Sequence, residues 1–294
     1  MNVQRLQGSL FCLIALIGAL ATLAMERFAP QSEIILLAVL IVVLGIPHGA
    51  LDTVFAHRLY GIRSLWGWLG FSLGYLLLAG LVVCLWRIAP VAFLSGFLLI
   101  SIMHFSGDPV AGTPLVSRIL YAGAVIIFPS FLHGAEIRQL FGYLVGPHAA
   151  QAVVPVLTTL AWPWSLGLAL AVIESLTRDR LTALEMASVA VLAVLAPPLI
   201  SFTLFFCGMH SARHIIRTVI YTGRDSGRWL VIAALLPMLG VMLVSAVLWQ
   251  FLKNTPLDAR VVQIVFVGLA ALTVPHMALV ERVRFSGWLK GAAK

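Results

Sequence analysis

The chain has 294 residues, of which 61% are hydrophobic and only 10% are charged, and its mean hydropathy is +1.05. Soluble globular domains carry about a quarter charged residues, so this composition excludes a soluble protein and predicts an integral membrane protein. The net charge of +8 does not indicate nucleic-acid binding, because basic residues in cytoplasmic loops are the usual source of such an excess in a multi-pass protein.

Ten apolar segments are candidates for helices that cross a membrane. In chain order they are residues 8–25, 33–56, 66–86, 90–107, 115–131, 152–173, 182–196, 199–221, 228–251 and 260–280. If Pro197-Pro198 does not form a turn, residues 182–221 become one kinked element and the number of spans falls to nine. Residues 132–150 are predicted to form a loop with a short helix at the membrane surface. We therefore expect an all-α transmembrane bundle in which residues 1–294 form a single integral-membrane domain.

The distribution of basic residues predicts which side of the membrane each loop faces. With ten spans and the N-terminus inside, fourteen of the 19 Lys and Arg residues fall at inside ends and five at outside ends. This bias follows the positive-inside rule. Both termini are then expected inside, in a multi-pass protein of the inner (plasma) membrane of the cell.

Three of these segments carry pairs of polar residues spaced by four positions. The pairs are His48 with Asp52, His104 with Asp108, and His210 with His214. Residues four apart lie on the same face of a helix. In the ten-span topology, all three helices run from outside to inside and place their histidines in the second half. The nine-span topology would instead put His48 and His104 at the opposite end of the bundle from His210.

Four neutral imidazoles at one depth are suited to iron, copper or zinc. Asp52 and Asp108 can orient the rings one turn away by accepting their N–H groups, or can bind the metal directly. The alternative is that the histidines only form hydrogen bonds between neighbouring helices. Ionisable side chains at membrane depth usually have a function, and four histidines with two matched aspartates favour a metal site. His276 is expected at the same depth, as a fifth ligand, a contact to a substrate or a structural residue.

The segments around these residues resemble a known family. The motifs are PHGALD at residues 47–52, HFSGD at residues 104–108 and GMHSARH at residues 208–214. In this order and with this topology they resemble the Brp/Blh family of bacterial and archaeal membrane proteins, which are β-carotene 15,15′-dioxygenases. The resemblance covers essentially the whole chain. It implies an iron-dependent enzyme that cleaves β-carotene, or a related carotenoid, centrally with O2 to give retinal.

The resemblance also implies roles for particular residues. The Fe(2+)-binding histidines of the family fall on His48, His104, His210 and His214. No catalytic residue is expected beyond the metal centre. Because the substrate dissolves in the bilayer, aromatic residues can line a path that holds it, although ordinary packing of the bundle is the alternative. Examples are Phe105, Trp162, Trp164, Phe205 and Phe206. The released retinal is expected to serve a rhodopsin-type protein.

Two other functions also fit histidines at membrane depth. One is a membrane electron-transfer protein that holds haem between histidines. The other is a proton- or metal-coupled transporter in which histidines and aspartates form a relay. A zinc protease is disfavoured because the chain contains no HExxH motif. No nucleic-acid partner is expected.

Overall fold

The computed structural model describes residues 3–24, 29–223 and 227–283, and every regular element within these residues is a helix. The first half of the chain contains α1 (Val3–Ala24), α2 (Pro30–Leu40), η1 (Ile41–Gly45), α3 (Pro47–Ala50), α4 (Asp52–Tyr60), α5 (Leu65–Ile88), α6 (Pro90–Phe105), α7 (Leu115–Ile127), α8 (Pro129–Leu132) and α9 (Gly134–Val145). The second half contains α10 (Pro147–Arg178), α11 (Arg180–Leu195), α12 (Pro198–Phe205), η2 (Phe206–Ser211), α13 (Ala212–Thr222), α14 (Gly227–Phe251) and α15 (Leu257–Val283). The elements η1 and η2 are π-helical.

Prolines and glycines determine where many of these helices begin and end. The helices α2, α3, α6, α8, α10 and α12 have a proline in their first turn, where the missing N–H is no loss and the fixed φ suits the helix. Gly61 and Gly223 follow α4 and α13 with φ of 61° and 90°. Glycine reaches such positive φ without strain. These residues therefore divide the apolar sequence into separate helices.

Eight helical stretches in the described residues are long and apolar enough to cross a membrane, and α6 is a shorter apolar helix. No residue of α5 is buried, and Leu236 on α14 is 78% exposed. Apolar side chains that face outward all along a helix suit contact with lipid, because the hydrocarbon core is as apolar as leucine. The chain is therefore an all-helical, multi-pass membrane protein.

The predicted segments agree closely with these helices. The eight candidate spans and α6 account for nine of the ten, and the tenth, residues 182–196, is α11. Both α6 and α11 have 16 residues, or about 24 Å at 1.5 Å per residue, which is less than the roughly 30 Å of hydrocarbon. Ala196 and Pro197 are extended, both with ψ of 146°, so residues 182–221 do not form one continuous helix. The predicted loop at 132–150 contains α9.

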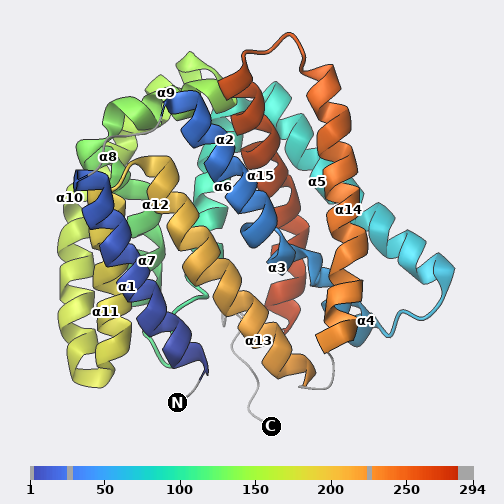
Figure 1. The fold of residues 1–294 in the computed structure, drawn as a ribbon, viewed down its shortest axis with the longest axis horizontal. Coiled ribbons are helices and arrows are strands. Elements are labelled where there is room, and N and C mark those ends of the chain that lie inside the picture. The colour runs from blue at the N-terminus through green and yellow to red at the C-terminus, as the bar shows by residue number, and fades with distance from the viewer. Residues whose placement is uncertain (1–2, 25–28, 224–226, 284–294) are drawn as a thin grey trace.

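The number of spans and the side that each terminus faces stay predictions. Four of the basic residues expected inside, Arg224, Arg284, Lys290 and Lys294, lie outside the described residues, as do both ends of the chain. Helix α1 begins and α15 ends at the same edge of the bundle, the lower edge in Figure 1. This arrangement is what an even number of passes produces.

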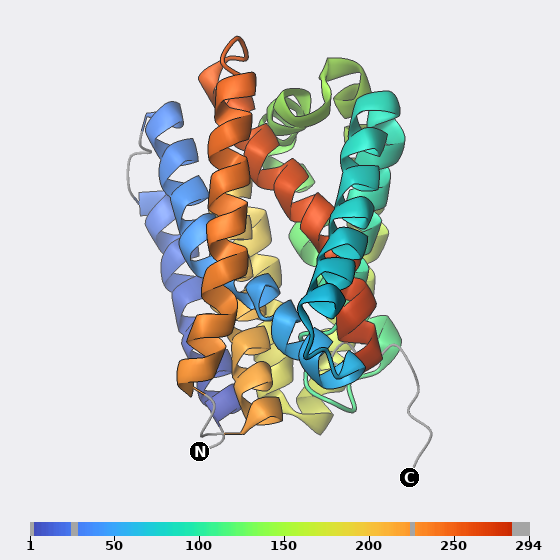
Figure 2. The same ribbon diagram turned by 90° about the vertical axis from the view of Figure 1, so that its right-hand side faces the viewer.

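The four chain segments that carry the candidate histidines run side by side in one direction. In Figure 1, α2, α6, α12 and α15 all lead from the upper edge of the bundle toward its lower half. Figure 2 shows α15 behind the gap between the ribbons of α14 and α5. Helix α15 packs on α2, α4, α5 and α9, and η1 packs on η2. These contacts bring residues far apart in the sequence to one level inside the bundle.

Candidate metal centre

Five buried histidines meet in the lower half of the bundle. His48 lies on α3, His104 on α6, His210 in η2, His214 on α13 and His276 on α15, and each is between 2% and 6% exposed. The ring centroid of His48 lies 6.2 Å from that of His104, 5.0 Å from His210, 5.4 Å from His214 and 5.3 Å from His276. We call these five residues the histidine cluster. The structure thus places the four predicted ligands together, at one depth, and adds His276 to them.

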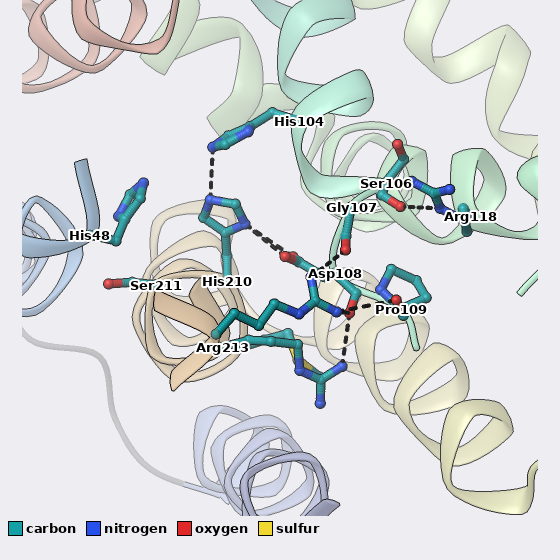
Figure 3. Close-up of polar contacts among 12 residues, drawn as sticks. His48, His104, Ser106, Gly107, Asp108, Pro109, Arg118, His210, Ser211 and Arg213 are labelled. Carbon is teal, nitrogen blue, oxygen red and sulfur yellow. Dashed lines mark hydrogen bonds and ion pairs between the residues drawn. The ribbon is translucent and has the colours of Figure 1, made fainter. Parts of the chain in front are cut away.

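The ring nitrogens of the histidine cluster are close enough to share one ion. His48, His104 and His276 each offer a ligand atom, and these three atoms all lie within 4.8 Å of one another. The Nε2 atoms of His104 and His210 are 2.9 Å apart (Figure 3). With metal–nitrogen bonds of about 2.0–2.1 Å, two ligands of one ion lie about 3 Å apart. The spacing between His104 and His210 is therefore close to that of neighbouring ligands.

The hydrogen bonds of three imidazoles determine which nitrogen carries the proton. Nδ1 of His48 contacts the carbonyl of Gly45 (2.5 Å). Nδ1 of His210 contacts the carboxylate of Asp108 (2.9 Å), and Nδ1 of His276 contacts the carboxylate of Asp52 (2.7 Å). A carbonyl or a carboxylate can only accept, so each Nδ1–H donates and each neutral ring keeps a lone pair on Nε2.

Nδ1 of His104 and Nε2 of His276 are buried ring nitrogens of the histidine cluster with no hydrogen-bond partner within the described structure. A buried polar atom that is left unpaired is unfavourable, and a cation bound by the lone pairs on the Nε2 atoms would remove this penalty at His276. Neutral imidazoles whose opposite N–H is held by a carboxylate or carbonyl are also the usual form of histidine ligands. The residues present therefore fit a transition-metal ion.

The two aspartates orient different rings from those expected. The sequence predicted that each would lie one helical turn from the histidine of its own motif. Asp52 accepts instead from His276, and Asp108 accepts from His210. The reason is local: Leu51, with ψ of −1°, separates α3 from α4, and α6 ends at Phe105, before Asp108. Neither motif is a continuous helix, so the spacing of four does not keep its two side chains on one face.

Two π-helical turns position the histidines of the second and eighth predicted spans. In η1, the N–H of Ile46 bonds to the carbonyl of Ile41, five residues earlier (3.0 Å). The hydroxyl of Ser211, at the end of η2, donates to the carbonyls of Leu44 (2.7 Å) and Gly45 (3.1 Å). Single π-helical turns are rare and often occur at functional sites. Here the two turns are linked by the hydroxyl of Ser211, and they place the rings of His48 and His210 next to each other.

Aromatic rings cover the histidine cluster. The ring of Phe105 lies 4.8 Å from that of His210, and Phe206 stacks on His210 at 5.7 Å and 18°. A Cβ atom on Gly45 would overlap the ring of Phe206, so this glycine allows Phe206 to approach η1. Phe55 contacts His214 at 5.8 Å. These rings surround the imidazoles with apolar surface and keep water away from them.

The two predicted tryptophans lie elsewhere. Trp162 is 72% exposed and packs on Phe131 at 5.2 Å. The Nε1–H of Trp164 donates to the carbonyl of Leu120 at 2.8 Å, and its ring lies against Gly123. Trp162 therefore contacts α8 and Trp164 contacts α7, and neither contact is with the histidine cluster. Of the aromatic residues proposed from the sequence, the structure brings Phe105 and Phe206 into contact with the histidine cluster.

A buried polar network that the sequence did not predict holds the loop after α6. The guanidinium of Arg213 contacts both oxygens of Glu185 (2.6 and 2.9 Å) and the carbonyl of Asp108 (3.1 Å). Gln7 accepts from Nε of Arg213 at 2.8 Å. Arg217 donates to the carbonyls of Gly107 and Asp108 at 2.6 and 2.8 Å. Two features of the sequence pointed toward this network. Glu185 is an ionisable residue inside a predicted span, and Arg213 lies beside the histidines.

The fold and the site define a multi-pass helical membrane protein with a buried histidine cluster that can hold a metal ion. Residues 39–283 match the model of a family described as Beta-carotene 15,15′-dioxygenase. A relative named Beta-carotene 15,15′-dioxygenase, from an uncultured marine bacterium 66A03, is 32% identical over 251 residues, which cover 82% of this chain and 90% of the relative. No solved structure matches the chain. The chain belongs to the β-carotene 15,15′-dioxygenase family and is a carotenoid dioxygenase, which confirms the resemblance found in the three motifs.

Proposed function

We propose that this enzyme cleaves β-carotene, or a closely related carotenoid, at its central double bond and releases retinal. Family membership supports the reaction class, and the relative's name supports the substrate and the position of cleavage. The observation that carries the proposal is the buried histidine cluster, inside a bundle whose surface is apolar. Each carbon of the broken double bond becomes the aldehyde carbon of one retinal. Both oxygen atoms of O2 are used, so no further reductant is required.

The metal that we propose is Fe(2+), held by His48, His104, His210 and His214, with His276 as a fifth nitrogen donor. Imidazole ligands suit iron, copper and zinc, so the donor set alone leaves the metal open, and the reaction with O2 favours iron. When bound, Fe(2+) supplies the electrons that activate O2 toward an alkene. We propose no catalytic residue beyond this metal centre.

The side chains around the metal centre have two tasks in this proposal. Asp52, Asp108 and the carbonyl of Gly45 hold the Nδ1–H groups outward, so that the lone pairs on Nε2 face one another. Phe105 and Phe206 pack on the imidazole of His210 and keep the site apolar. An apolar site suits a substrate that reaches the enzyme from the hydrocarbon of the bilayer.

The membrane topology that we propose has ten spans, with both termini inside, in the inner (plasma) membrane. The direction shared by α2, α6, α12 and α15 in Figure 1 supports this arrangement. Residues 1–294 then form a single catalytic domain, which takes a carotenoid from lipid and passes retinal to a rhodopsin-type protein. A haem-binding electron carrier or a coupled transporter is less favoured, because the chain belongs to a dioxygenase family.

Expression in cells that make β-carotene tests the proposed reaction. We expect the orange pigment to decrease and retinal to accumulate, as measured by extraction and chromatography. Cells that express the His210→Ala variant at the same level in the membrane should keep their β-carotene. For the metal, chelator-treated purified protein should recover activity with Fe(2+) but not with Zn(2+). Intact β-carotene beside correctly inserted wild-type protein would argue against this substrate, and a reduced-minus-oxidised spectrum with sharp bands would favour haem.

Asp52→Asn is expected to weaken iron binding and retinal formation without abolishing them. Asp52 accepts from His276 at 2.7 Å and from the hydroxyl of Tyr75 at 2.9 Å, and asparagine has only one oxygen with which to accept. Changes to residues that orient a metal ligand typically lower affinity or activity about 10–100-fold. Metal titration and kinetics on the purified variant measure this. A variant as inactive as His48→Ala would indicate instead that Asp52 binds the metal directly.

A further inference from the structure

Tyr75 is a polar residue in the middle of a helix that otherwise faces lipid. None of the residues of α5 is buried, and the two leucines that follow Tyr75, Leu76 and Leu77, are 64% and 60% exposed. Tyr75 itself is only partly exposed. A hydroxyl group without a hydrogen-bond partner is unfavourable in an apolar environment. We therefore expect the hydroxyl of Tyr75 to find its partners inside the bundle.

The hydroxyl of Tyr75 contacts two other helices. It lies 2.9 Å from Oδ2 of Asp52 on α4 and 3.3 Å from the carbonyl oxygen of Leu272 on α15. A tyrosine hydroxyl has one hydrogen to donate, and the shorter contact is with the carboxylate of Asp52. Leu272 lies about one helical turn before His276. Both contacts therefore place Tyr75 next to the fifth histidine of the cluster.

Asp52 connects Tyr75 to the histidine cluster. Its other oxygen, Oδ1, accepts from Nδ1 of His276 at 2.7 Å, and the residue is 3% exposed. The opposite nitrogen of this imidazole, Nε2, has no hydrogen-bond partner in the described structure. The ring centroid of His276 lies 4.9 Å from that of His104. The hydroxyl, the carboxylate and the imidazole thus form a chain of hydrogen bonds that leads from α5 into the cluster.

We propose that Tyr75 is a positioning residue of the metal centre, which fixes the carboxylate of Asp52 and, through it, the imidazole of His276. The inference rests on the metal centre of the proposed function and adds a residue from outside the histidine cluster. The terminal torsion of an aspartate side chain has a broad energy minimum, so one hydrogen bond leaves its plane free to turn. A second bond on the opposite oxygen holds that plane. Nε2 of His276 then stays directed at the other imidazoles.

Tyr75→Phe removes the hydroxyl and keeps the ring. We expect metal-depleted protein with this change to bind Co(2+) about tenfold more weakly than the wild type, at the lower end of the range for residues that orient a metal ligand. The visible absorption of bound Co(2+) depends on its ligands, and it should shift toward the spectrum of His276→Ala. Titration of the purified protein in detergent measures both. No carotenoid is needed, so the result does not depend on cleavage.

Tyr143→Phe is the matched control, because it also removes a hydroxyl that takes part in a hydrogen bond. This hydroxyl accepts from Gln139 at 2.8 Å on α9, at the upper edge of the bundle in Figure 1. The backbone carbonyl of Tyr143 accepts from Gln263 of α15. Gln263 precedes His276 by about thirteen residues, or roughly 20 Å along the helix. Tyr143→Phe should therefore bind Co(2+) with the affinity and the spectrum of the wild type.

The double variant Tyr75→Phe with His276→Ala tests the route by which Tyr75 acts. If the hydroxyl acts through His276, its removal should weaken Co(2+) binding no further once the imidazole is absent. An equal loss with and without His276 would overturn the inference, as would a Tyr75→Phe variant with the affinity and spectrum of the wild type. Tyr75→Leu, which introduces the commonest residue of α5, replaces Tyr75→Phe if that variant does not fold.

The same preparations separate this inference from the proposed reaction. A wild type that binds Co(2+), a Tyr75→Phe variant that binds it more weakly through His276, and intact β-carotene would support the role of Tyr75 and contradict the reaction. Retinal formation by a wild type whose Co(2+) binding is unaffected by Tyr75→Phe would contradict the role of Tyr75 alone. A wild type that binds no Co(2+) and no Fe(2+) would overturn the metal centre and the role of Tyr75 together.

Discussion

Alanine in place of any one of four histidines is expected to abolish iron binding and retinal formation. The four are His48, His104, His210 and His214. Each imidazole lies within ring contact of at least two others in the histidine cluster. Because the loss of a residue that only orients a ligand already lowers affinity or activity about 10–100-fold, the loss of a donor itself should exceed about 100-fold. Iron content per protein and retinal formation, measured on the same preparation, test this.

His148→Ala is the control for these variants, because His148 is exposed at the start of α10, outside the cluster. It should keep both the iron and the activity of the wild type. His276→Ala decides whether the fifth histidine is a donor, and we expect it to lower iron affinity at least about tenfold. If one of the four alanine variants folds, retains its iron and still forms retinal, that histidine is not a ligand.

The histidine cluster could be predicted because membrane topology constrains depth. Counting basic residues at the ends of the spans oriented three helices in the same direction, which put His48, His104 and His210 at one level. The structure confirms that level through ring contacts of 4.4 to 6.2 Å among these three. His276 was placed at the right depth by the same count. Its membership of the cluster depends on how α15 packs, which no sequence pattern specifies.

The partners of the aspartates could not be predicted, because periodicity describes a regular helix and these segments are irregular. The break at Leu51 and the end of α6 at Phe105 turn Asp52 and Asp108 toward other helices. The same limit applies to Trp162, which the composition of α10 left free to face either the bundle or the lipid. Contacts between helices decide such cases, whereas hydropathy and spacing describe one helix at a time.

Breaking the buried pair of Arg213 and Glu185 is expected to destabilise the protein strongly. Both residues are 4% exposed, and their charged groups are 2.6 Å apart. Removing one partner leaves a buried charge without compensation, which typically costs about 3–5 kcal/mol. Glu185→Leu should therefore lower the thermal midpoint of unfolding in detergent micelles. Glu174→Gln, which breaks the exposed pair of Glu174 and Arg178, is the control and should change stability by at most about 1 kcal/mol.

The double variant Arg213→Leu with Glu185→Leu separates stability from the metal site. With both charges gone, most of the lost stability should return, since a buried ion pair can often be replaced by apolar residues of similar size. Iron affinity should stay low, because Arg213 also holds the carbonyl of Asp108, whose carboxylate orients His210. If iron affinity returns together with stability, the network supports the fold alone. If iron affinity stays low while stability returns, Arg213 positions the ligand His210 through Asp108. The buried charged pair then serves the metal site rather than the stability of the fold.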